Sequence, residues 1–169
     1  MAKRTGTIEK NGVSISLLND DKTRQALANI EKSVGASMAK AISVGAISIA
    51  NTAKKIAPVD TGSMANSITY DLIENTAKQV TAIVGPTKDI IYGKYVEYGT
   101  GIYATGPSKA KKIPWVYYNE RLDQFFTTSG MKAQPFLYPA LQRNRKRIND
   151  LLAKAVTEGW GKFTVEVKK

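Results

Sequence analysis

The chain has 169 residues, enough for one domain with a substantial core, and its 43% hydrophobic and 23% charged residues are ordinary for a soluble globular protein. It contains no cysteine and no histidine, which excludes disulfides, thiolate and imidazole metal sites, and catalysis by a thiolate or an imidazole base. The 25 Lys and Arg residues exceed the 14 Asp and Glu residues, and this net charge of +11 favours polyanions or acidic protein surfaces as partners. Paired carboxylates and lysine chemistry remain formally open, but we expect a non-enzymatic protein without a cofactor or metal.

No segment of the sequence predicts a membrane span or an export signal. No continuous apolar run approaches the roughly 18 residues that a span needs, and no apolar stretch follows the basic Met-Ala-Lys-Arg start. We therefore expect synthesis in the cytoplasm and no membrane partner.

The first 56 residues predict a β-hairpin followed by one long helix. Residues 5–18 contain Asn11-Gly12, a strong two-residue turn signal, followed by alternating apolar and serine residues. Residues 20–56 carry an apolar stripe at helical spacings of three and four. Its members are Leu27, Ile30, Val34, Met38, Ala41, Gly45, Ile49, Ala53 and Ile56. Gly35 and Gly45 each cost roughly 1 kcal/mol relative to Ala inside a helix, which leaves a bend or break near either one open.

The middle of this helix, residues 35–50, is rich in Ala, Gly and Ser, which permits the close approach of another backbone. One interpretation is a core helix packed on the protein's own sheet. The other adds a second, subunit-facing side, because Ile42, Ala46 and Ile47 lie off the main stripe. The core helix is favoured, and both interpretations stay open from the sequence.

Residues 57–62, APVDTG, predict a rigid corner after the helix. Pro58 cannot continue a helix interior, and Gly62 can take a positive φ. Asp60 and Thr61 have short polar side chains that bond local amides, so we expect the corner to aim the element that follows it.

Residues 63–119 predict a sheet region. Alternating apolar residues indicate strands at 66–75 and 78–86, joined as an antiparallel hairpin, and a third strand at 115–119. A short helix is expected at 90–98 and an exposed loop at 99–112, which carries a basic cluster of Lys109, Lys111 and Lys112. Residues 121–133 are interpreted as an excursion that ends in a turn at Ser129-Gly130.

The C-terminal part predicts a helix over 139–158, with Pro139 in its first turn, and a strand over 161–169. Phe163, Val165 and Val167 alternate with polar residues in that strand, which could join the edge of the protein's own sheet or that of a neighbouring subunit. We therefore predict a single domain over 1–169 of the α+β class. An antiparallel sheet would pack with a long helix from the N-terminal half and a C-terminal helix.

Two patterns could suggest chemistry. Asp60 and Glu97 could form a carboxylate pair, but we favour Asp60 bonding its own turn and Glu97 pairing with a Lys or Arg. The glycines at 85–89 and 99–101 lack the spacing of phosphate-binding loops, so nucleotide binding is not expected.

A basic run on the C-terminal helix is the candidate for contact with a polyanion. It consists of Arg143, Arg145, Lys146 and Arg147. Helical spacing spreads these side chains around more than half of the circumference, and no aromatic residues interleave them as stacking platforms. A solvated face or an acidic protein partner is favoured over DNA, and any DNA contact should be sequence-independent and salt-sensitive.

Three blocks in this order resemble the phage tail-component or neck protein family of the Hong-Kong-97 type, which is gene-product-ten-like. The blocks are APVDTG with Ser67 and Ile68, YVEYGT at 95–100, and QPFLYPAL at 134–141. Tyr98 stands where the family favours Phe, and Met64 where it favours Leu. The residues that carry the motif are Pro58, Asp60, Thr61, Gly62, Tyr95, Glu97, Gly99, Thr100, Pro135 and Pro139. The resemblance favours the short helix at 90–98, with its tyrosines against the sheet.

This resemblance implies a virion protein at the head–tail junction of a long-tailed bacteriophage, assembled in the host cytoplasm as a ring of six or twelve copies. Its partners would be other copies of itself, head-closure or connector proteins, and tail-tube or terminator proteins, with transient contact to genomic DNA. Candidate subunit contacts are Lys109, Lys111, Lys112, Phe163, Val165 and Val167. The alternatives are a tail terminator that caps the tail tube and, in a different class, a sequence-independent DNA-binding accessory protein.

Overall fold

The computed structural model describes residues 3–160 apart from 11–12, 20, 77–78 and 107–111. The elements follow in the order β1 (Lys3–Lys10), β2 (Val13–Asn19), α1 (Asp21–Ile56), α2 (Ser63–Ser67), β3 (Ile68–Asn75), β4 (Val80–Pro86), α3 (Gly93–Tyr98), the 3-10 helix η1 (Gly101–Tyr103), β5 (Trp115–Asn119), β6 (Gln124–Thr128) and α4 (Leu137–Trp160). The predicted α+β class is confirmed. The predicted terminal strand 161–169, with Phe163, Val165 and Val167, lies outside the described residues, as do Lys109 and Lys111.

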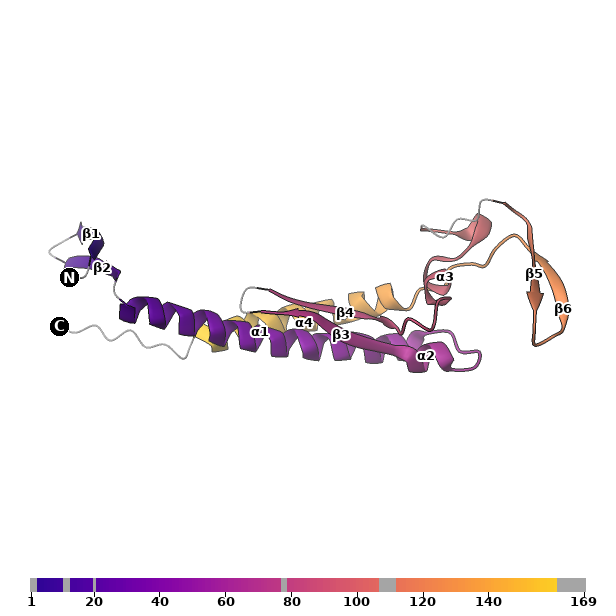
Figure 1. Cartoon of the computed structure of the whole chain (residues 1–169), viewed down its shortest axis with the longest axis horizontal. Coiled ribbons are helices and arrows are strands. Elements are labelled where there is room, and N and C mark those ends of the chain that lie inside the picture. The colour runs from indigo at the N-terminus through magenta and orange to yellow at the C-terminus, as the bar shows by residue number, and fades with distance from the viewer. Residues whose placement is uncertain (1–2, 11–12, 20, 77–78, 107–111, 161–169) are drawn as a thin grey trace.

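The strands form three separate antiparallel hairpins rather than one sheet, with β1 paired to β2, β3 to β4 and β5 to β6. In Figure 1 the N-terminal hairpin lies at one end of α1 and the β5–β6 hairpin at the other end of an elongated molecule. The predicted hairpin at 66–86 is confirmed, with Ile68 opposite Pro86 and Asn75 opposite Val80.

The centre of the molecule is the pairing of α1 with α4, with β3 and β4 lying along α1 (Figure 1). The core contains small residues of α1 together with two large, fully buried side chains, Phe136 and Ile68. Its members are Ala50, Ala53, Ala57, Met64, Ile68, Phe136 and Ala140. Burial of this apolar surface, at about 25 cal/mol per Å², holds the two helices and the β3–β4 hairpin together. The interpretation of α1 as a core helix is thus confirmed.

The helix α1 is continuous through its glycines. One of them, Gly45, lies where α1 packs against α4. A Cβ on Gly45 would lie 3.1 Å from Cγ1 of Ile148, so the missing side chain makes room for α4. Farther along the pair, a Cβ on Gly159 would lie 2.9 Å from the Cα of Val34. The helices therefore approach closely at two points, as the small-residue composition predicts.

A buried amide also joins the two helices. Nδ2 of Asn144 donates to Oγ1 of Thr52 at 2.9 Å and to the carbonyl oxygen of Ala140 at 2.9 Å. Both amide hydrogens thus have acceptors, which avoids the cost of burying an unpaired polar group and fixes the register of α4 on α1.

One stretch of α1, Arg24–Ile56, is long and apolar enough to cross a membrane by length and composition alone. A mostly buried core helix of a soluble protein passes the same test, whereas 28% of the apolar stretch is buried here; the buried residues of α1 include Ala41, Ala46, Ala50 and Ala53. Its high mean hydropathy comes from Ala and Ile residues spread through the helix and not from a continuous apolar run.

Candidate assembly interface

The APVDTG corner turns the chain from α1 into α2. Gly62 has a φ of 80°, which confirms the positive φ expected for it, and Pro58 lies just after α1 ends at Ile56. The hydroxyls of Thr61 and Ser63 are 2.9 Å apart. Asp60 was expected to bond its own turn, but its carboxylate pairs with Arg121 at 3.4 Å. Both partners of that pair are largely exposed, so it contributes little to stability.

Glu97 fixes the start of α4. Its Oε2 accepts hydrogen bonds from the backbone N–H groups of Phe136 at 2.7 Å and Leu137 at 2.9 Å, and its Oε1 accepts from that of Tyr138 at 3.0 Å. The first N–H groups of a helix have no partner within the helix, and the helix dipole favours negative charge there. The expectation that Glu97 pairs with a Lys or Arg is therefore wrong, because a helix N-terminus supplies its partners.

This bond explains why the second and third sequence blocks occur together. Glu97 is only 6% exposed, and a buried carboxylate needs such donors to offset its lost hydration. The N–H of Gln134 also donates to the carbonyl oxygen of Val96 at 2.8 Å. Pro135 is exposed between these contacts, and Pro139 is half-buried in the first turn of α4 as predicted. The blocks are structural: α3 holds α4 in place.

The predicted exposed loop at 99–112 begins as a packed segment, which corrects that expectation for its first residues. The N–H of Thr100 donates to the carbonyl oxygen of Met131 at 2.9 Å, and its hydroxyl accepts from the N–H of Met131 at 2.9 Å. The N–H of Ile102 donates to the carbonyl oxygen of Ser129 at 3.0 Å. Gly99 and Gly101 are buried, and a Cβ on Gly101 would lie 1.9 Å from that same carbonyl oxygen. Lys112 is exposed farther along.

The tyrosines of α3 are only partly covered, and Tyr98 lines a groove together with Ala82 and Val84 of β4. Tyr95 is 38% exposed and Tyr98 is 45% exposed. The ammonium group of Lys94 lies 4.9 Å from the centre of the Tyr95 ring, within the range of a cation–π contact. The buried side chain of α3 is that of Glu97, and Val96 packs partly buried against the core.

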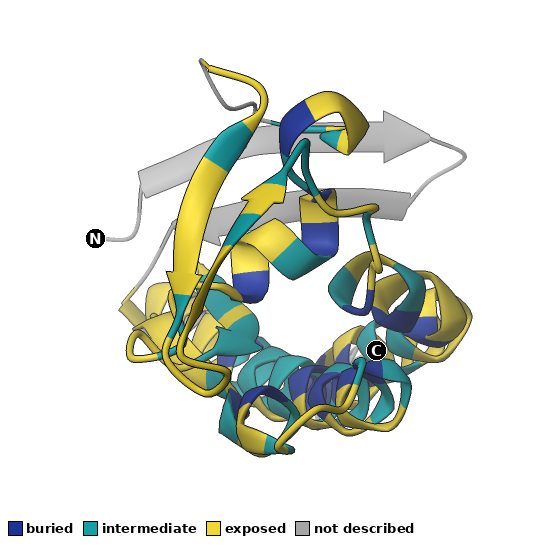
Figure 2. Cartoon of the chain, turned by 90° about the vertical axis from the view of Figure 1, so that its right-hand side faces the viewer, coloured by how far each residue is buried: buried dark blue, intermediate teal, exposed yellow. Residues whose placement is uncertain are grey.

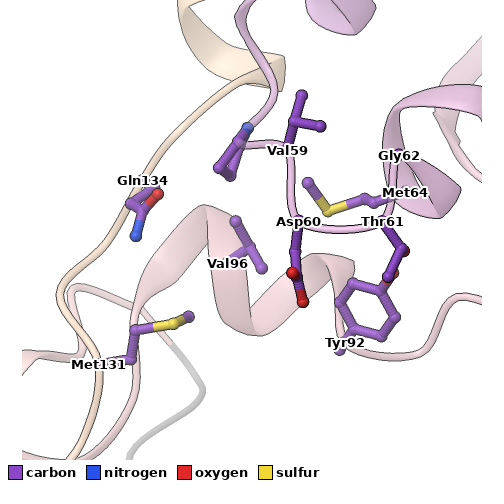
Figure 3. Close-up of a pocket in the computed structure, with 10 residues that line it drawn as sticks. Val59, Asp60, Thr61, Gly62, Met64, Tyr92, Val96, Met131 and Gln134 are labelled. Carbon is purple, nitrogen blue, oxygen red and sulfur yellow. The ribbon is translucent and has the colours of Figure 1, made fainter.

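The corner and α3 enclose a small cleft of about 410 Å³ (Figure 3). Its lining includes Val59, Asp60, Tyr92, Val96 and Gln134. Asp60 is the one carboxylate among the lining residues, and Glu97 is engaged elsewhere with the α4 N-terminus. The Asp60–Glu97 pair that the sequence raised is therefore not formed, and the cleft has no acid–base arrangement for hydrolysis.

The arm, defined as residues Trp115–Thr128, is an exposed hairpin rich in aromatic residues. Its strands β5 and β6 pair in register, with Tyr117 opposite Phe126 and Tyr118 opposite Phe125. Neither strand carries a buried residue, and the arm projects beyond α3 (Figures 1 and 2). An isolated two-stranded hairpin is only marginally stable in water, so an apolar arm of this kind implies a covering surface.

The strand β6 is a feature that the sequence reasoning missed. Residues 121–133 were interpreted as an excursion, but Gln124–Thr128 form a strand. The available signal was the run Phe125-Phe126-Thr127-Thr128, because aromatic and β-branched residues favour strands. Asp123 takes a φ of 51° in the turn, a conformation that Asp tolerates.

The arm is held together by aromatic pairs and one polar contact. The ring centres of Tyr118 and Phe125 lie 5.1 Å apart, and those of Tyr117 and Phe126 lie 5.9 Å apart. The Tyr118 hydroxyl donates to the Asp123 carboxylate. That hydrogen bond, with a smaller effect of desolvation, raises the pKa of Tyr118 from its ordinary value of 10.0.

A second uncovered apolar surface, the groove, lies between β4, α3 and α4 and has a volume of about 480 Å³. It is lined by Ile49, Ala82, Val84, Pro86, Gly93, Lys94, Glu97, Tyr98, Leu137, Tyr138 and Leu141. Tyr138 is 64% exposed and Leu141 is 45% exposed, so its α4 wall is open to solvent.

The basic run on α4 is exposed at all four positions, Arg143, Arg145, Lys146 and Arg147. At 100° per residue, Asp150 falls between Arg143 and Lys146 on the outward face, while Arg145 lies on another side. The helix therefore presents mixed charge rather than one basic edge.

Comparison with known families gives the context for these surfaces. Residues 21–99 match the family HK97-gp10_like, described as "Bacteriophage HK97-gp10, putative tail-component". This segment is HK97-gp10-like. The match runs from the start of α1 to Gly99 and so includes the corner and Glu97, which confirms the resemblance over 79 of the 169 residues. No curated protein and no solved structure matches the chain.

The matched family is described as a "putative tail-component" of a bacteriophage. The HK97-gp10-like segment contains α1, the β3–β4 hairpin and α3, whereas the arm and α4 lie beyond it. The third block, QPFLYPAL, therefore stands outside the matched residues but is joined to them by Glu97.

Proposed function

We propose that this chain is a non-enzymatic virion protein that forms a ring at the head–tail junction of a long-tailed bacteriophage. The match to a tail-component family supports the virion role. The observation that supports ring formation is the exposed arm. Its apolar side chains protrude from the rest of the molecule without a covering surface. Solvent-exposed apolar surface of this kind is typical of an assembly site.

In this proposal the α1–α4 pair is a rigid wedge and the peripheral elements make the contacts. The wedge is fixed by the Asn144 amide, the two glycine contacts and the Glu97 cap. Repetition of one contact around an axis closes a ring of six or twelve copies, the numbers that the resemblance implies. Head-closure or connector proteins would bind one face of the ring and tail-tube or terminator proteins the other.

The test is electron microscopy of lysates from the phage that encodes this chain, with the gene deleted. Filled heads beside separate tails of normal length are the expected result, because joining would fail while both parts still form. Overlong, unattached tails would instead favour the tail terminator. Intact, infectious particles would overturn the virion role.

The runner-up is a sequence-independent DNA-binding accessory protein. The exposed cations of α4 and the net charge of +11 favour it. Asp150 and Glu158 on the same helix interrupt its positive charge, so the helix does not offer one continuous basic edge to a DNA backbone. An acidic protein surface is therefore the better partner. Filter binding of duplex DNA with a steep fall in affinity between 50 and about 200 mM salt, together with intact particles from the deletion phage, would support it over the ring.

A further inference from the structure

The arm has two faces, and one of them is free. Side chains alternate along a strand, so Val116, Tyr118 and Phe125 share one face, and Trp115, Tyr117 and Phe126 share the other. Val116 is 61% exposed and Phe125 is 74% exposed, while Trp115 and Phe126 are half-buried. The face with Val116, Tyr118 and Phe125 is called the free face below.

The groove of the same molecule does not receive this face. No residue of the arm lines the groove. The ion pair between Arg121 and Asp60 places the arm's tip at the corner, whereas the groove lies between β4, α3 and α4 (Figure 1). One chain thus carries an uncovered apolar projection and an uncovered apolar groove that do not contact each other.

We infer that the free face of the arm seats in the groove of a second copy of this chain. Because the two surfaces are different, the contact is head-to-tail: each copy gives its arm to one neighbour and its groove to the other. This inference rests on the proposed ring and names the surfaces that would close it.

Charge favours a second copy as the occupant. The tip of the arm carries Glu120 and Asp123 with Arg121, a net charge of −1 in a chain of net charge +11. The groove has cations at its edge, and its one lining carboxylate, Glu97, is engaged by the N-terminus of α4. Lys94 lines the groove, and Arg145 lies one helical turn beyond Leu141 on the same face of α4. An arm seated in the groove would place the acidic tip near these cations and bury apolar side chains on both partners.

The arm also suits insertion because it is preorganised. Its aromatic pairs and the Tyr118–Asp123 hydrogen bond hold the strands in register before any partner binds. A rigid aromatic surface loses less conformational entropy on binding than a flexible segment would. The groove offers matching aliphatic and aromatic walls in Val84, Leu137 and Tyr138.

The first test uses two complementary variants of the full chain, Phe125→Asp in the arm and Leu141→Asp in the groove. Size-exclusion chromatography with light scattering should show higher oligomers for the wild type and monomers for each variant alone. An equimolar mixture should form heterodimers, because an intact arm of the Leu141→Asp copy can enter the intact groove of the Phe125→Asp copy. Chain growth should stop there.

The control is Ile83→Thr, which replaces an exposed apolar side chain on the opposite face of β4 from Ala82 and Val84. An uncharged β-branched residue is chosen because Asp71 lies directly opposite on β3, and two carboxylates there would repel each other. This control should assemble as the wild type does. Circular dichroism should show the same helix content in all three variants, which keeps misfolding of the α1–α4 core apart from lost contact. Because Phe125→Asp also removes the Tyr118–Phe125 ring contact within the arm, Val116→Asp, on the free face but outside both ring pairs, should lose assembly as Phe125→Asp does. Wild-type assembly by Phe125→Asp, or a mixture that stays monomeric, would overturn the inference.

The absence of cysteine from the sequence permits a second test by cross-linking. Oxidised Phe125→Cys/Leu141→Cys should give a ladder of covalent oligomers. Dimers from Phe125→Cys alone would mean that arms meet arms, and would also overturn the inference. A monomeric wild type would refute the contact between copies. If both the wild type and Phe125→Asp formed rings, only the role of the arm as the contact would be refuted, and the proposed function would stand.

Discussion

At the scale of single residues, Glu97 and the glycines after it determine where the second half of the chain lies. Both carboxylate oxygens of Glu97 accept hydrogen bonds from backbone N–H groups at the N-terminus of α4. Gly99 and Gly101, with φ values of 70° and 61°, let the following loop lie directly on residues 129–131. These positions join the HK97-gp10-like segment to the arm and to α4.

Replacement of the carboxylate by an amide tests the cap. Glu97→Gln should lower the free energy of unfolding by about 2 kcal/mol or more, because the amide nitrogen cannot accept a hydrogen bond and each buried N–H left unpaired costs about 1–3 kcal/mol. Loss of the charge also removes its attraction to the helix dipole. Urea unfolding would measure the change.

The matched control for the cap is Glu31→Gln, on the exposed surface of α1. Its effect should stay within about 0.5 kcal/mol, as for most surface substitutions. Equal effects of the two substitutions would contradict the capping role of Glu97.

The second residue prediction concerns the contact of Gly101 with Ser129. Gly101→Ala should destabilise the protein by about 3 kcal/mol or more. Left-handed strain contributes about 1–2 kcal/mol, and the 1.9 Å approach to the Ser129 carbonyl oxygen forces the segments apart. Hydrogen exchange at the amides of Thr100 and Ile102 should lose its protection.

Gly85→Ala is the control for that substitution, because a Cβ at Gly85 would meet nothing within 4 Å. It should be neutral or slightly stabilising, since Ala restricts the unfolded chain more than Gly. If Gly101→Ala proved as mild as Gly85→Ala, the two segments could not lie as close as described.

At the scale of elements, local patterns predicted most of the fold and tertiary contacts decided the rest. The long helix, the β3–β4 hairpin and α4 follow from apolar periodicity within each segment, which the sequence displays directly. The cap did not follow, because its partners are 39–41 residues from Glu97. The sequence contained one indirect sign of the cap. The residues before α4, Gln134-Pro135-Phe136, include none of the usual N-cap side chains, so the cap had to come from elsewhere in the chain.

The division into three hairpins was likewise beyond reach of local reasoning. Alternation predicts strands but does not say which strands share a sheet. The strand β6 was hidden because Phe125 and Phe126 are adjacent, so both faces of the arm are apolar and period-two alternation is lost. That same two-sided apolar pattern is what makes the arm a candidate interface.

The close packing of α1 and α4 predicts that Gly→Ala substitutions at two positions change the stability of the protein in opposite directions. Gly45→Ala should be neutral or stabilise the protein by up to about 1 kcal/mol, because Ala is the better helix former and the neighbouring Ile148 side chain can shift. Gly159→Ala should destabilise it by about 1–2 kcal/mol, because a Cβ there would lie 2.7 Å from Cγ2 of Val34 and 2.9 Å from its Cα, and the Cα moves only with the helix. Thermal unfolding of both variants measures the difference, and equal stabilisation at both sites would contradict the helix pairing.

At the scale of the whole molecule, the apolar character of α1 has two readings that an experiment separates. As a membrane span, Arg24–Ile56 would lie in lipid; as a core helix, it packs on α4 and the β3–β4 hairpin. Removing α1 from α4 would expose the Asn144 amide and the alanine-rich core, and Lys40 would enter the hydrocarbon at a cost of about 2.5–3.5 kcal/mol near its centre.

We expect the full chain to stay at the bottom of a flotation gradient with zwitterionic lipid vesicles. Anionic vesicles at low salt serve as the control, because the net charge of +11 should hold the chain there until about 0.5 M salt screens it. Flotation with zwitterionic vesicles that resists salt would refute the core-helix packing and with it the rigid wedge.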